Sequence, residues 1–248
     1  MDESLYLEMA ALENRYWWFV AKRRIILALI RRYLDRPLAD ARVCDVGCGS
    51  GGLLRDLRAV GATVLGTDSS PLARELAARD GLEVVDAYLP DRLPLGPFDA
   101  LVMSDVLEHV EADAASVAAA ASRLVVGGIM VCTVPAHPWM WTERDKYHGH
   151  FRRYRRAEFA RLFDLPLLRP ARLSYYNSGP FPVMAAARLG KKLLGRDRAS
   201  GAHGGDIREL LAPLNAILRE TFAFERHLLT RFNLPLGASL ISVHRRVG

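Results

Sequence analysis

A glycine-rich turn between an apolar segment and a helical one is the feature that most restricts how this chain can fold. The stretch RVCDVGCGSGGLL, residues 42–54, passes from strand-like residues into four glycines and then into two leucines. A glycine turn that opens a helix lets backbone N–H groups approach a ligand closely. Gly47, Gly49 and Gly52 match the dinucleotide fingerprint G-x-G-x-x-G, whereas Gly47, Gly49 and Gly51 match a tighter G-x-G-x-G. The two patterns predict different ligands, so residues farther along the chain must decide between them.

Strand-like and helical segments alternate around this turn. Before it, residues 1–33 carry apolar side chains at helical spacing, and Pro37 ends the helix. After it, we expect helices at 51–60, from Pro71 onward and at 112–124. The strand-like segments are residues 42–47, 63–68, 82–87, 98–105 and 127–135. This alternation predicts an α/β fold with parallel strands and helices on both faces of the sheet.

The second half of the chain is less regular. A long connection that is rich in aromatic and cationic residues follows Pro135. Beyond it we expect a helix at 157–163, an apolar stretch at 167–176, an inserted helical hairpin at 178–194, a glycine-rich loop at 195–206, a long helix at 207–231 and a final strand at 237–246. The length of 248 residues is enough for one α/β domain with a sizeable core.

Composition and the first residues indicate the cellular setting. The three cysteines, Cys44, Cys48 and Cys132, have no regular spacing, which argues against a disulfide framework and favours a reducing compartment. Acidic residues stand at the N-terminus, where a secretory signal needs a basic head and an apolar run. The net charge of +6 suits an anionic substrate or a membrane surface, but solubility alone also explains it. We therefore expect a cytoplasmic protein.

Carboxylates stand at the ends of three successive strand-like segments. Asp45 precedes the glycine turn by two residues, where a carboxylate repels the pyrophosphate of a dinucleotide but suits a cationic amino-acid ligand. Asp68 ends the next segment, where an acid can bind two ribose hydroxyls. Asp86 ends the third segment, where a side-chain acceptor can take an adenine amino group. The motif SDVLEHV, residues 104–110, ends the fourth.

In this order and spacing, these motifs resemble those of the class I S-adenosylmethionine-dependent methyltransferases. The resemblance is dense over residues 43–135 and looser elsewhere. It implies a Rossmann-like, seven-stranded, mostly parallel sheet with helices on both faces, an antiparallel last strand inserted at one side, and inserted helices late in the chain. It also implies one methyltransferase domain over 1–248, made of a helical lid (1–36), a cofactor-binding core (37–135) and acceptor-side insertions with the C-terminal strands (136–248). The implied cofactor is S-adenosylmethionine and the implied product is S-adenosylhomocysteine.

The resemblance assigns roles to residues of the core. The glycine turn surrounds the methionine part of the cofactor, Asp68 binds the ribose, and the next two strand ends approach the adenine ring and the amino group. In the EH pair, His109 contacts the cofactor, whereas Glu108 suits a helix N-terminus equally well. The predicted cofactor-binding residues of the core are Asp45, Gly47, Cys48, Gly49, Asp68, Ser69, Asp86, Ala87, Ser104 and His109.

The segment ENRYWWFVAKRR, residues 13–24, resembles the N-terminal helix of a bacterial small-molecule subgroup of these enzymes. In that subgroup the helix lies over the cofactor as a lid. Tyr16 or Trp17 would then face the sulfonium, because an aromatic face attracts a cation. Arg23 or Lys22 would meet the cofactor carboxylate. The alternative is that the aromatic residues belong to the core and the cations are solvated.

The segment after the fifth strand faces the transferring methyl group in this family. It follows Pro135 directly, which makes His137 the first expected base or acceptor-orienting residue. Tyr16 would reach the acceptor from the lid, and His148 is the second expected histidine. For both histidines, a solvated loop position is an equally good reading.

The same segment supplies the residues expected to bind the acceptor. These are Tyr147, Arg153 and Tyr154, of which Arg153 belongs to a cluster of four arginines suited to a carboxylate or phosphate. A solvated helix start explains that cluster equally well. His148 and His150 with Asp145 are too few for a metal site on a loop, so we expect no metal.

These observations predict a methyltransferase that modifies an oxygen or nitrogen of a small molecule in a specialised biosynthetic pathway. A lipid-like or membrane-associated acceptor, such as a quinone or a lipid-linked intermediate, is the alternative. Residues 174–195 support it, since they are apolar and then basic and suit peripheral contact with a membrane. No N-P-P-Y or D-P-P-Y motif follows the fourth strand segment, so we expect no nucleic-acid partner. A module that binds the cofactor without catalysis stays open.

Overall fold

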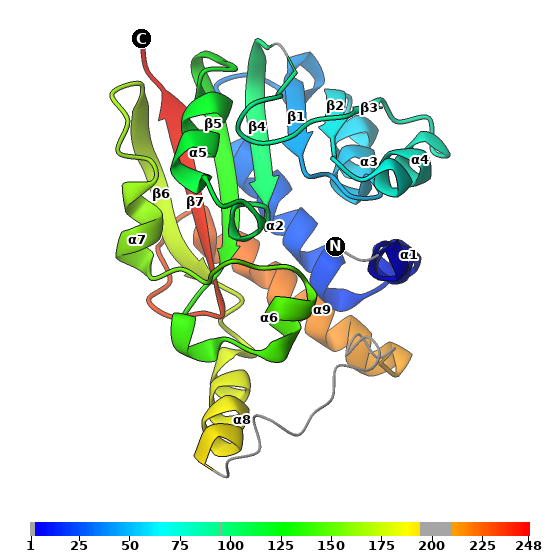
Figure 1. Ribbon diagram of the computed structural model, residues 1–248, viewed down its shortest axis with the longest axis vertical. Helices are drawn as coiled ribbons and strands as arrows, with labels where there is room; N and C mark the ends of the chain where they lie inside the picture. The colour runs from blue at the N-terminus through cyan, green and yellow to red at the C-terminus, as the bar shows by residue number, and fades with distance from the viewer. Residues whose placement is uncertain (1–2, 95, 194–209) are drawn as a thin grey trace.

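A seven-stranded sheet organises the computed structural model, which describes residues 3–94, 96–193 and 210–248 (Figure 1). The strand order is β3-β2-β1-β4-β5-β7-β6. The strands are β1 (Arg42–Val46), β2 (Thr63–Thr67), β3 (Val84–Val85), β4 (Phe98–Ser104), β5 (Leu124–Pro135), β6 (Leu168–Tyr176) and β7 (Ser239–Arg246). β7 runs antiparallel to both β5 and β6, whereas the pairs from β3 to β5 are parallel. The expected α/β architecture, with an inserted antiparallel last strand, is confirmed.

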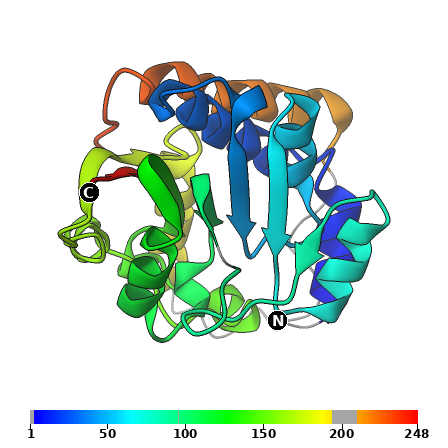
Figure 2. The same cartoon turned by 90° about the horizontal axis from the view of Figure 1, so that it is seen from above.

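Helices cover both faces of this sheet (Figure 2). One face carries α2 (Trp17–Tyr33), α3 (Gly52–Ala59) and α9 (Ala212–Leu229), whose apolar side chains form one buried cluster with β1, β4 and β5. The other face carries α5 (Asp113–Ala121) and α7 (Arg156–Arg161), which share a second cluster with the sheet. α4 (Pro71–Ala78) contacts β3 and α1 (Glu3–Leu12) at the edge of the sheet. The short helix α6 (Glu143–Tyr147) lies in the connection after β5.

The N-terminal segment differs from the single helix expected over residues 1–33. Its described part forms two helices, α1 and α2, which are separated by a turn in which Tyr16 is extended. The backbone carbonyl of Glu13 accepts a hydrogen bond from the Arg23 guanidinium at 2.6 Å, and the Glu13 carboxylate reaches the glycine turn. These tertiary contacts stabilise the turn and so interrupt the helix. The helical spacing of apolar residues alone does not predict them.

Two further elements differ from the expectations. β3 contains only two residues, although six residues of that segment were expected to be extended. The expected hairpin at 178–194 is a single helix, α8 (Phe181–Leu193), over its described residues. The glycine-rich loop expected at 195–206 lies outside the described residues. Among the described helices, none has the length and apolarity required to cross a bilayer.

A buried carboxylate joins α9 to the turn between β6 and α8. Glu225 is 5% exposed and accepts hydrogen bonds from the backbone N–H groups of Asn177 and Ser178, both at 2.7 Å, and of Gly179 at 3.3 Å. Asn177 has a φ of 59°, a left-handed conformation that few side chains favour. Three N–H donors on one carboxylate stabilise this turn and fix the direction in which α8 leaves the sheet.

Replacing Glu225 with alanine should therefore destabilise the protein by about 2–3 kcal/mol, because three buried N–H groups lose a charged acceptor. Chemical unfolding followed by circular dichroism measures this loss. Glu220 lies on the same helix but is exposed and forms surface ion pairs with Arg24 and Arg219. Glu220→Ala is the matched control, and it should cost less than about 1 kcal/mol. Equal losses in the two variants would contradict the role of Glu225.

Candidate active site

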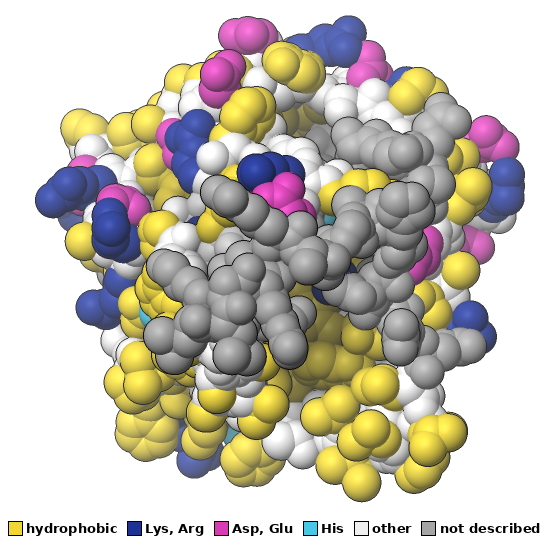
Figure 3. Space-filling view, turned by 60° about the horizontal axis from the view of Figure 1, so that its bottom comes forward, with side chains coloured by type: hydrophobic (Ala, Val, Ile, Leu, Met, Phe, Trp, Pro, Cys, Tyr) yellow, Lys and Arg dark blue, Asp and Glu magenta, His cyan; other side chains and the backbone are white. Residues whose placement is uncertain are grey.

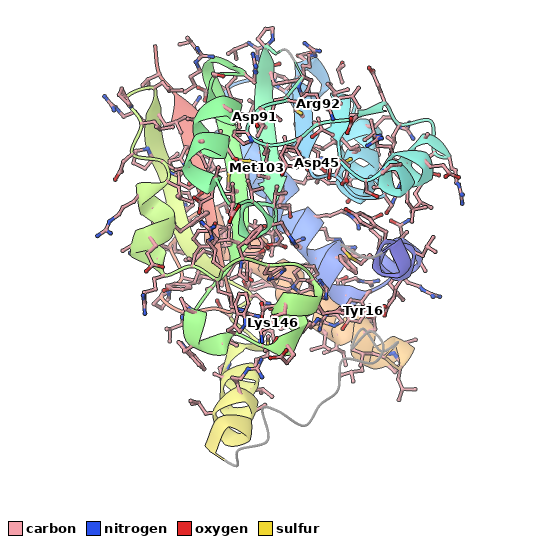
Figure 4. All side chains as sticks on the ribbon, in the orientation of Figure 1. Tyr16, Asp45, Asp91, Arg92, Met103 and Lys146 are labelled. Atoms are coloured by element: carbon pink, nitrogen blue, oxygen red, sulfur yellow. The ribbon has the colours of Figure 1, made fainter. Side chains whose placement is uncertain are left out.

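A cavity of about 970 Å³ opens where the carboxyl ends of β1, β2 and β4 meet the N-terminal helices. Ligands of open α/β sheets bind at this edge, next to the point where the strand order reverses. β1 is that point here, because β2 and β4 lie on its two sides. Figure 4 shows Asp45 at the end of β1 and Tyr16 near the start of α2.

The glycine turn after β1 forms the floor of this cavity. Gly47, Gly49 and Gly51 have φ values of 69°, 55° and 89°, which side chains rarely adopt, whereas Gly52 begins α3 without a positive φ. The backbone thus uses the tighter pattern G-x-G-x-G. The N–H groups of Gly47 and Cys48 donate to the carbonyl of Thr67 at 2.8 and 2.9 Å. These bonds fix the turn to the end of β2.

Asp68 lies beside this turn and is 6% exposed. Its carboxylate accepts hydrogen bonds from the N–H groups of Gly49 and Ser70, each at 2.9 Å. The Tyr6 hydroxyl of α1 donates to the same carboxylate at 3.4 Å. Burial raises the pKa of Asp68, and the two N–H groups oppose that rise. The carboxylate is thus held rigidly at the strand end where a ribose diol is expected.

Asp45 is the most strongly perturbed of the carboxylates around the turn. It is 3% exposed, and burial raises its pKa to about 8, although the Lys22 ammonium partly opposes the shift. An empty site therefore holds Asp45 largely protonated at neutral pH. A cationic ligand group would favour the ionised form.

Hydrogen bonds of Glu13 hold the N-terminal helices in place next to the cavity. Its carboxylate accepts hydrogen bonds from the Gly52 N–H at 2.9 Å, from the Arg55 guanidinium at 2.6 Å and from the Ser50 hydroxyl. A Cβ atom at Gly52 would collide with this carboxylate, so glycine is needed for the contact. Arg23 adds a bond to Asp56 on α3 at 2.8 Å. Sequence reasoning did not identify Glu13, because an acidic residue in a helical segment carries no signal for such a contact.

Lys22 and Asp105 form an ion pair inside the cavity. The Lys22 ammonium lies 2.8 Å from Asp105 Oδ2 and 4.2 Å from the centre of the Trp18 ring. Burial opposes ionisation of Asp105, but Lys22 and a hydrogen bond from Thr133 hold its pKa below the ordinary value. Lys22, one of the two cations considered for the cofactor carboxylate, is thus paired with a residue of the SDVLEHV motif.

Three histidines, His109, His148 and His150, gather in the lining of the cavity. The rings of His109 and His150 lie 4.6 Å apart in an edge-to-face arrangement, and those of His148 and His150 lie 5.8 Å apart. Burial and neighbouring positive groups lower the pKa values of His109 and His148 to about 4, so both rings are neutral at pH 7. His150 Nδ1 lies 3.1 Å from Asp145 Oδ1, and Arg153 binds the two oxygens of Asp145 at 2.7 and 3.1 Å.

Glu108 lies next to these histidines and is 1% exposed. Burial, with the charge of Asp105, raises its pKa well above the ordinary value. Its Oε2 atom has no hydrogen-bond partner among the described residues. The backbone N–H of Phe151 donates to the Glu108 carbonyl at 2.7 Å, which ties the histidine-bearing loop to the end of β4.

Most of the residues expected to bind the cofactor line the cavity. These are Asp45, Gly47, Cys48, Gly49, Asp68, Ser69, Ala87, Ser104, His109, Trp17 and Arg23. Asp86 is not among the described lining residues, and its carboxylate pairs with Arg74 and Arg92. The cavity identifies neighbours of a ligand but not their roles, which stay predictions.

Only some of the residues expected on the acceptor side line the cavity. Tyr16, His148 and Arg153 line the cavity, whereas Tyr147, Tyr154 and His137 are not among its described lining residues. Tyr154 is buried, and its hydroxyl donates to Asp113 at 2.8 Å. The His137 ring stacks on Tyr175 and Phe181, and its Nε2 lies 2.9 Å from the Gly237 carbonyl oxygen. His137 has a φ of 62°, and this left-handed conformation turns the chain after β5. The neighbouring residues in the sequence do not predict this turn.

Comparison with known proteins decides the family. Residues 16–188, more than half of the chain, match the family described as "Methyltransferase domain". The chain belongs to the class I S-adenosylmethionine-dependent methyltransferases. This confirms the family, the enzyme class and the cofactor expected from the sequence.

Curated relatives match a shorter part of this methyltransferase. The ubiquinone biosynthesis O-methyltransferase of Xanthomonas oryzae is 36% identical over 134 residues, which cover 49% of this chain and 56% of that protein. The enzyme of the same name from Thiobacillus denitrificans is 41% identical over 107 residues, covering 39% and 46%. The chain thus spans about half the length of the curated relatives that it matches.

Solved structures share the fold over a longer range. The complex between the Haloferax volcanii Trm112 methyltransferase activator and a methyltransferase contains a chain that matches with a TM-score of 0.61 and 19% identity, covering 98% of both chains.

The pKa of Asp45 predicts that cofactor affinity depends on pH. Binding of the cofactor's ammonium group should ionise Asp45 and release a proton whenever the pH is below about 8. Affinity for S-adenosylmethionine should then increase by up to about tenfold per pH unit from pH 6 to pH 8 and level off above. Calorimetry in buffers of different ionisation enthalpy measures both quantities. Asp45→Asn should bind weakly and without this pH dependence. Constant affinity of the unmodified protein from pH 6 to 8 would refute the assignment.

The contacts of Glu13 predict how the lid responds to the cofactor. Hydrogen exchange of residues 12–24 should slow when S-adenosylmethionine binds, because a ligand beneath the helices adds contacts to them. Glu13→Gln should speed exchange of this segment in the empty protein, since the contact with Arg55 loses its charge. α5 serves as an internal control and should exchange equally in all samples. If residues 12–24 are equally protected with and without cofactor, this segment is core rather than lid.

Proposed function

We propose that this methyltransferase methylates a ring hydroxyl of a quinone-type acceptor with a lipid-like tail. The observation that carries the proposal is that one cavity is lined both by the glycine turn and by Met184, an apolar residue of α8. A volume of about 970 Å³ is at the upper end of the usual range for ligand cavities, so it leaves room for an acceptor beside the cofactor.

Away from the glycine turn, the cavity is lined by aromatic and apolar side chains beside charged and polar ones. Trp17, Trp18, Phe151, Met184 and Ala238 supply apolar surface there. An aromatic ring with a hydrocarbon tail gains free energy from such a lining, whereas a strongly polar acceptor does not. The polar and charged side chains there include the histidine cluster, Arg144, Asp145, Arg153 and Asn177.

Exposed apolar side chains lie on α8 and at the start of α9, and one of them, Met184, also lines the cavity. These residues are Val183, Met184, Leu189, Leu211, Leu214 and Ile217, with exposed fractions between 41% and 78%. Figure 3 shows hydrophobic side chains gathered on the face that carries these helices. We propose that this face makes peripheral contact with a membrane, from which a lipid-like acceptor would enter.

The relatives favour this acceptor over a water-soluble molecule of specialised metabolism. The Xanthomonas and Thiobacillus proteins are named for O-methyl transfer in ubiquinone biosynthesis. Because the aligned regions cover about half of those proteins, the names support an oxygen acceptor of the quinone class without identifying the molecule. The first expectation, a soluble small molecule, thus becomes the second candidate.

The chemistry needs alignment and the removal of one proton. The acceptor oxygen attacks the methyl carbon in line with the sulfonium, the carbon–sulfur bond breaks, and the carbon–oxygen bond forms. The hydroxyl proton passes to solvent water, because the lowered pKa of His148 and the hydrogen bond from Arg144 to its Nε2 make that imidazole a poor base. S-adenosylhomocysteine is the second product. Tyr16 and Trp17 exclude water from the lid side.

Methyl-transfer assays with labelled S-adenosylmethionine test the proposal. We expect kcat/KM for an isoprenoid-substituted catechol to exceed that for unsubstituted catechol by about tenfold, since burying about 60 Å² of apolar tail at about 25 cal/mol per Å² supplies about 1.5 kcal/mol. Mass spectrometry of the product should show one O-methyl group. Methylation of amine acceptors without any transfer to hydroxyls would refute the proposal.

A surface variant separates membrane contact from catalysis. In the double variant Val183→Asp/Leu189→Asp, vesicle binding should fall while turnover of unsubstituted catechol stays unchanged. Both side chains are exposed to solvent and neither is among the described residues that line the cavity. Glu143→Gln/Lys146→Gln changes an exposed ion pair on α6 and is the control. If vesicles of anionic phospholipid bind both double variants equally, the membrane contact lies elsewhere or does not occur.

A further inference from the structure

We propose that Glu108, His109 and His150 bind a divalent transition-metal ion in the active-site cavity. One potential ligand atom from each of these residues lies within 4.8 Å of the others. All three residues line the cavity. One carboxylate with two imidazoles is a ligand set that binds divalent transition metals and leaves positions open for a further ligand.

The site is close to the geometry that an ion requires. Ligand atoms around a tetrahedral ion with bonds of about 2.1 Å are about 3.4 Å apart. A separation of at most 4.8 Å therefore closes with side-chain movements below about 1 Å per ligand atom. The backbone does not need to move.

An orphaned buried oxygen indicates that the carboxylate lacks a ligand. Glu108 is 1% exposed, and its Oε2 atom has no hydrogen-bond partner in the described part of the chain. A buried polar atom without a partner costs free energy that a bound cation would recover. A structural role at a helix N-terminus does not explain this atom, because the helical turn at Leu107–His109 contains only three residues.

Both imidazoles are oriented by a second partner. His150 Nδ1 lies 3.1 Å from Asp145 Oδ1, which leaves Nε2 for a metal. The backbone of Gly149 accepts a hydrogen bond from the His109 ring, which likewise leaves one nitrogen free. Asp145 is itself held by Arg153 and by the Thr142 hydroxyl. Metal-binding histidines usually have such outer partners, which fix the ring and its tautomer.

The sequence alone suggests a different set, His148 and His150 with Asp145, all from one loop, for which we expected no metal. The fold instead brings His150 to the EH pair after β4, about forty residues earlier in the chain. Asp145 becomes an outer partner of the site rather than a ligand.

The role of the ion, unlike its binding, rests on the proposed hydroxyl acceptor. An ion with an open position would coordinate the acceptor hydroxyl and lower its pKa, as metals do with bound water. The proton would then leave to water, and the resulting oxyanion would take the methyl group from sulfur as the carbon–sulfur bond breaks. The charge of the ion also holds the oxygen in place for in-line attack.

Calorimetric titration of chelator-treated protein with Zn²⁺, and visible absorption after titration with Co²⁺, test the binding directly. We expect one saturable site per chain. Glu108→Gln and His150→Ala should weaken binding by about 100-fold or more, and Asp145→Asn by about 10–100-fold, the usual effect of losing an outer partner. His227→Ala, on α9 and away from the cavity, should bind as the unmodified protein does. Affinity for S-adenosylhomocysteine should persist in Glu108→Gln and His150→Ala, which shows that they are folded.

Each outcome bears on one of the two proposals. The absence of saturable binding to the unmodified protein, or unchanged binding in both Glu108→Gln and His150→Ala, overturns the metal site. If the unmodified protein binds no metal but still transfers the methyl group to a hydroxyl, the metal site is overturned and the proposed hydroxyl acceptor is supported. Stoichiometric binding that both variants abolish, without methyl transfer to any hydroxyl, supports the site and overturns the proposed function.

Discussion

The hydrogen bonds between the glycine turn and the end of β2 are the constraint on which the cofactor site depends. The Thr67 carbonyl accepts two of them and the Asp68 carboxylate accepts a third from Gly49, so the turn cannot move independently of the sheet. Left-handed glycines make this path possible, and the Glu13 carboxylate then binds the N–H of Gly52 on the outer side of the turn. The N-terminal helices are thereby positioned by the same few residues that shape the floor of the cavity.

Electrostatics divides the carboxylates of the cavity into two groups. Asp105 and Asp145 have cationic partners, Lys22 and Arg153, and their pKa values are lowered despite burial. Asp45 and Glu108 lack such direct partners among the described side chains, and burial raises their pKa values. In a low-dielectric space these two groups gain most from a positive ligand. The cofactor carries positive charge, which suits Asp45, whereas Glu108 lies on the histidine side, where a second positive group would be needed.

Sequence patterns predict the parts of this structure that local rules control. Alternating segments predict the sheet, and the order of Asp45, the glycines and Asp68 predicts residues that the structure brings together in one cavity. Tertiary contacts explain the errors. Helical spacing over residues 1–33 does not reveal the turn at Glu13, and a short β3 results from pairing with β2 over only two positions. The expected role of His137 at the acceptor stays a prediction: its ring stacks on Tyr175 and it is not among the described residues that line the cavity, whereas His150 is.

The acceptor side is built from long-range backbone pairing rather than from a free loop. The Phe151 N–H donates to the Glu108 carbonyl, and residues 136 and 154 form a parallel bridge, so the chain after β5 returns to the sheet on both sides of the histidines. Arg153 then fixes Asp145, which orients His150. A cluster fixed in this way keeps its geometry while the surfaces of α8 vary, because no hydrogen bond among the described residues joins the histidines to that helix. The histidine cluster and the exposed apolar surface of α8 therefore belong to separate parts of the fold, so that one can change without disturbing the other.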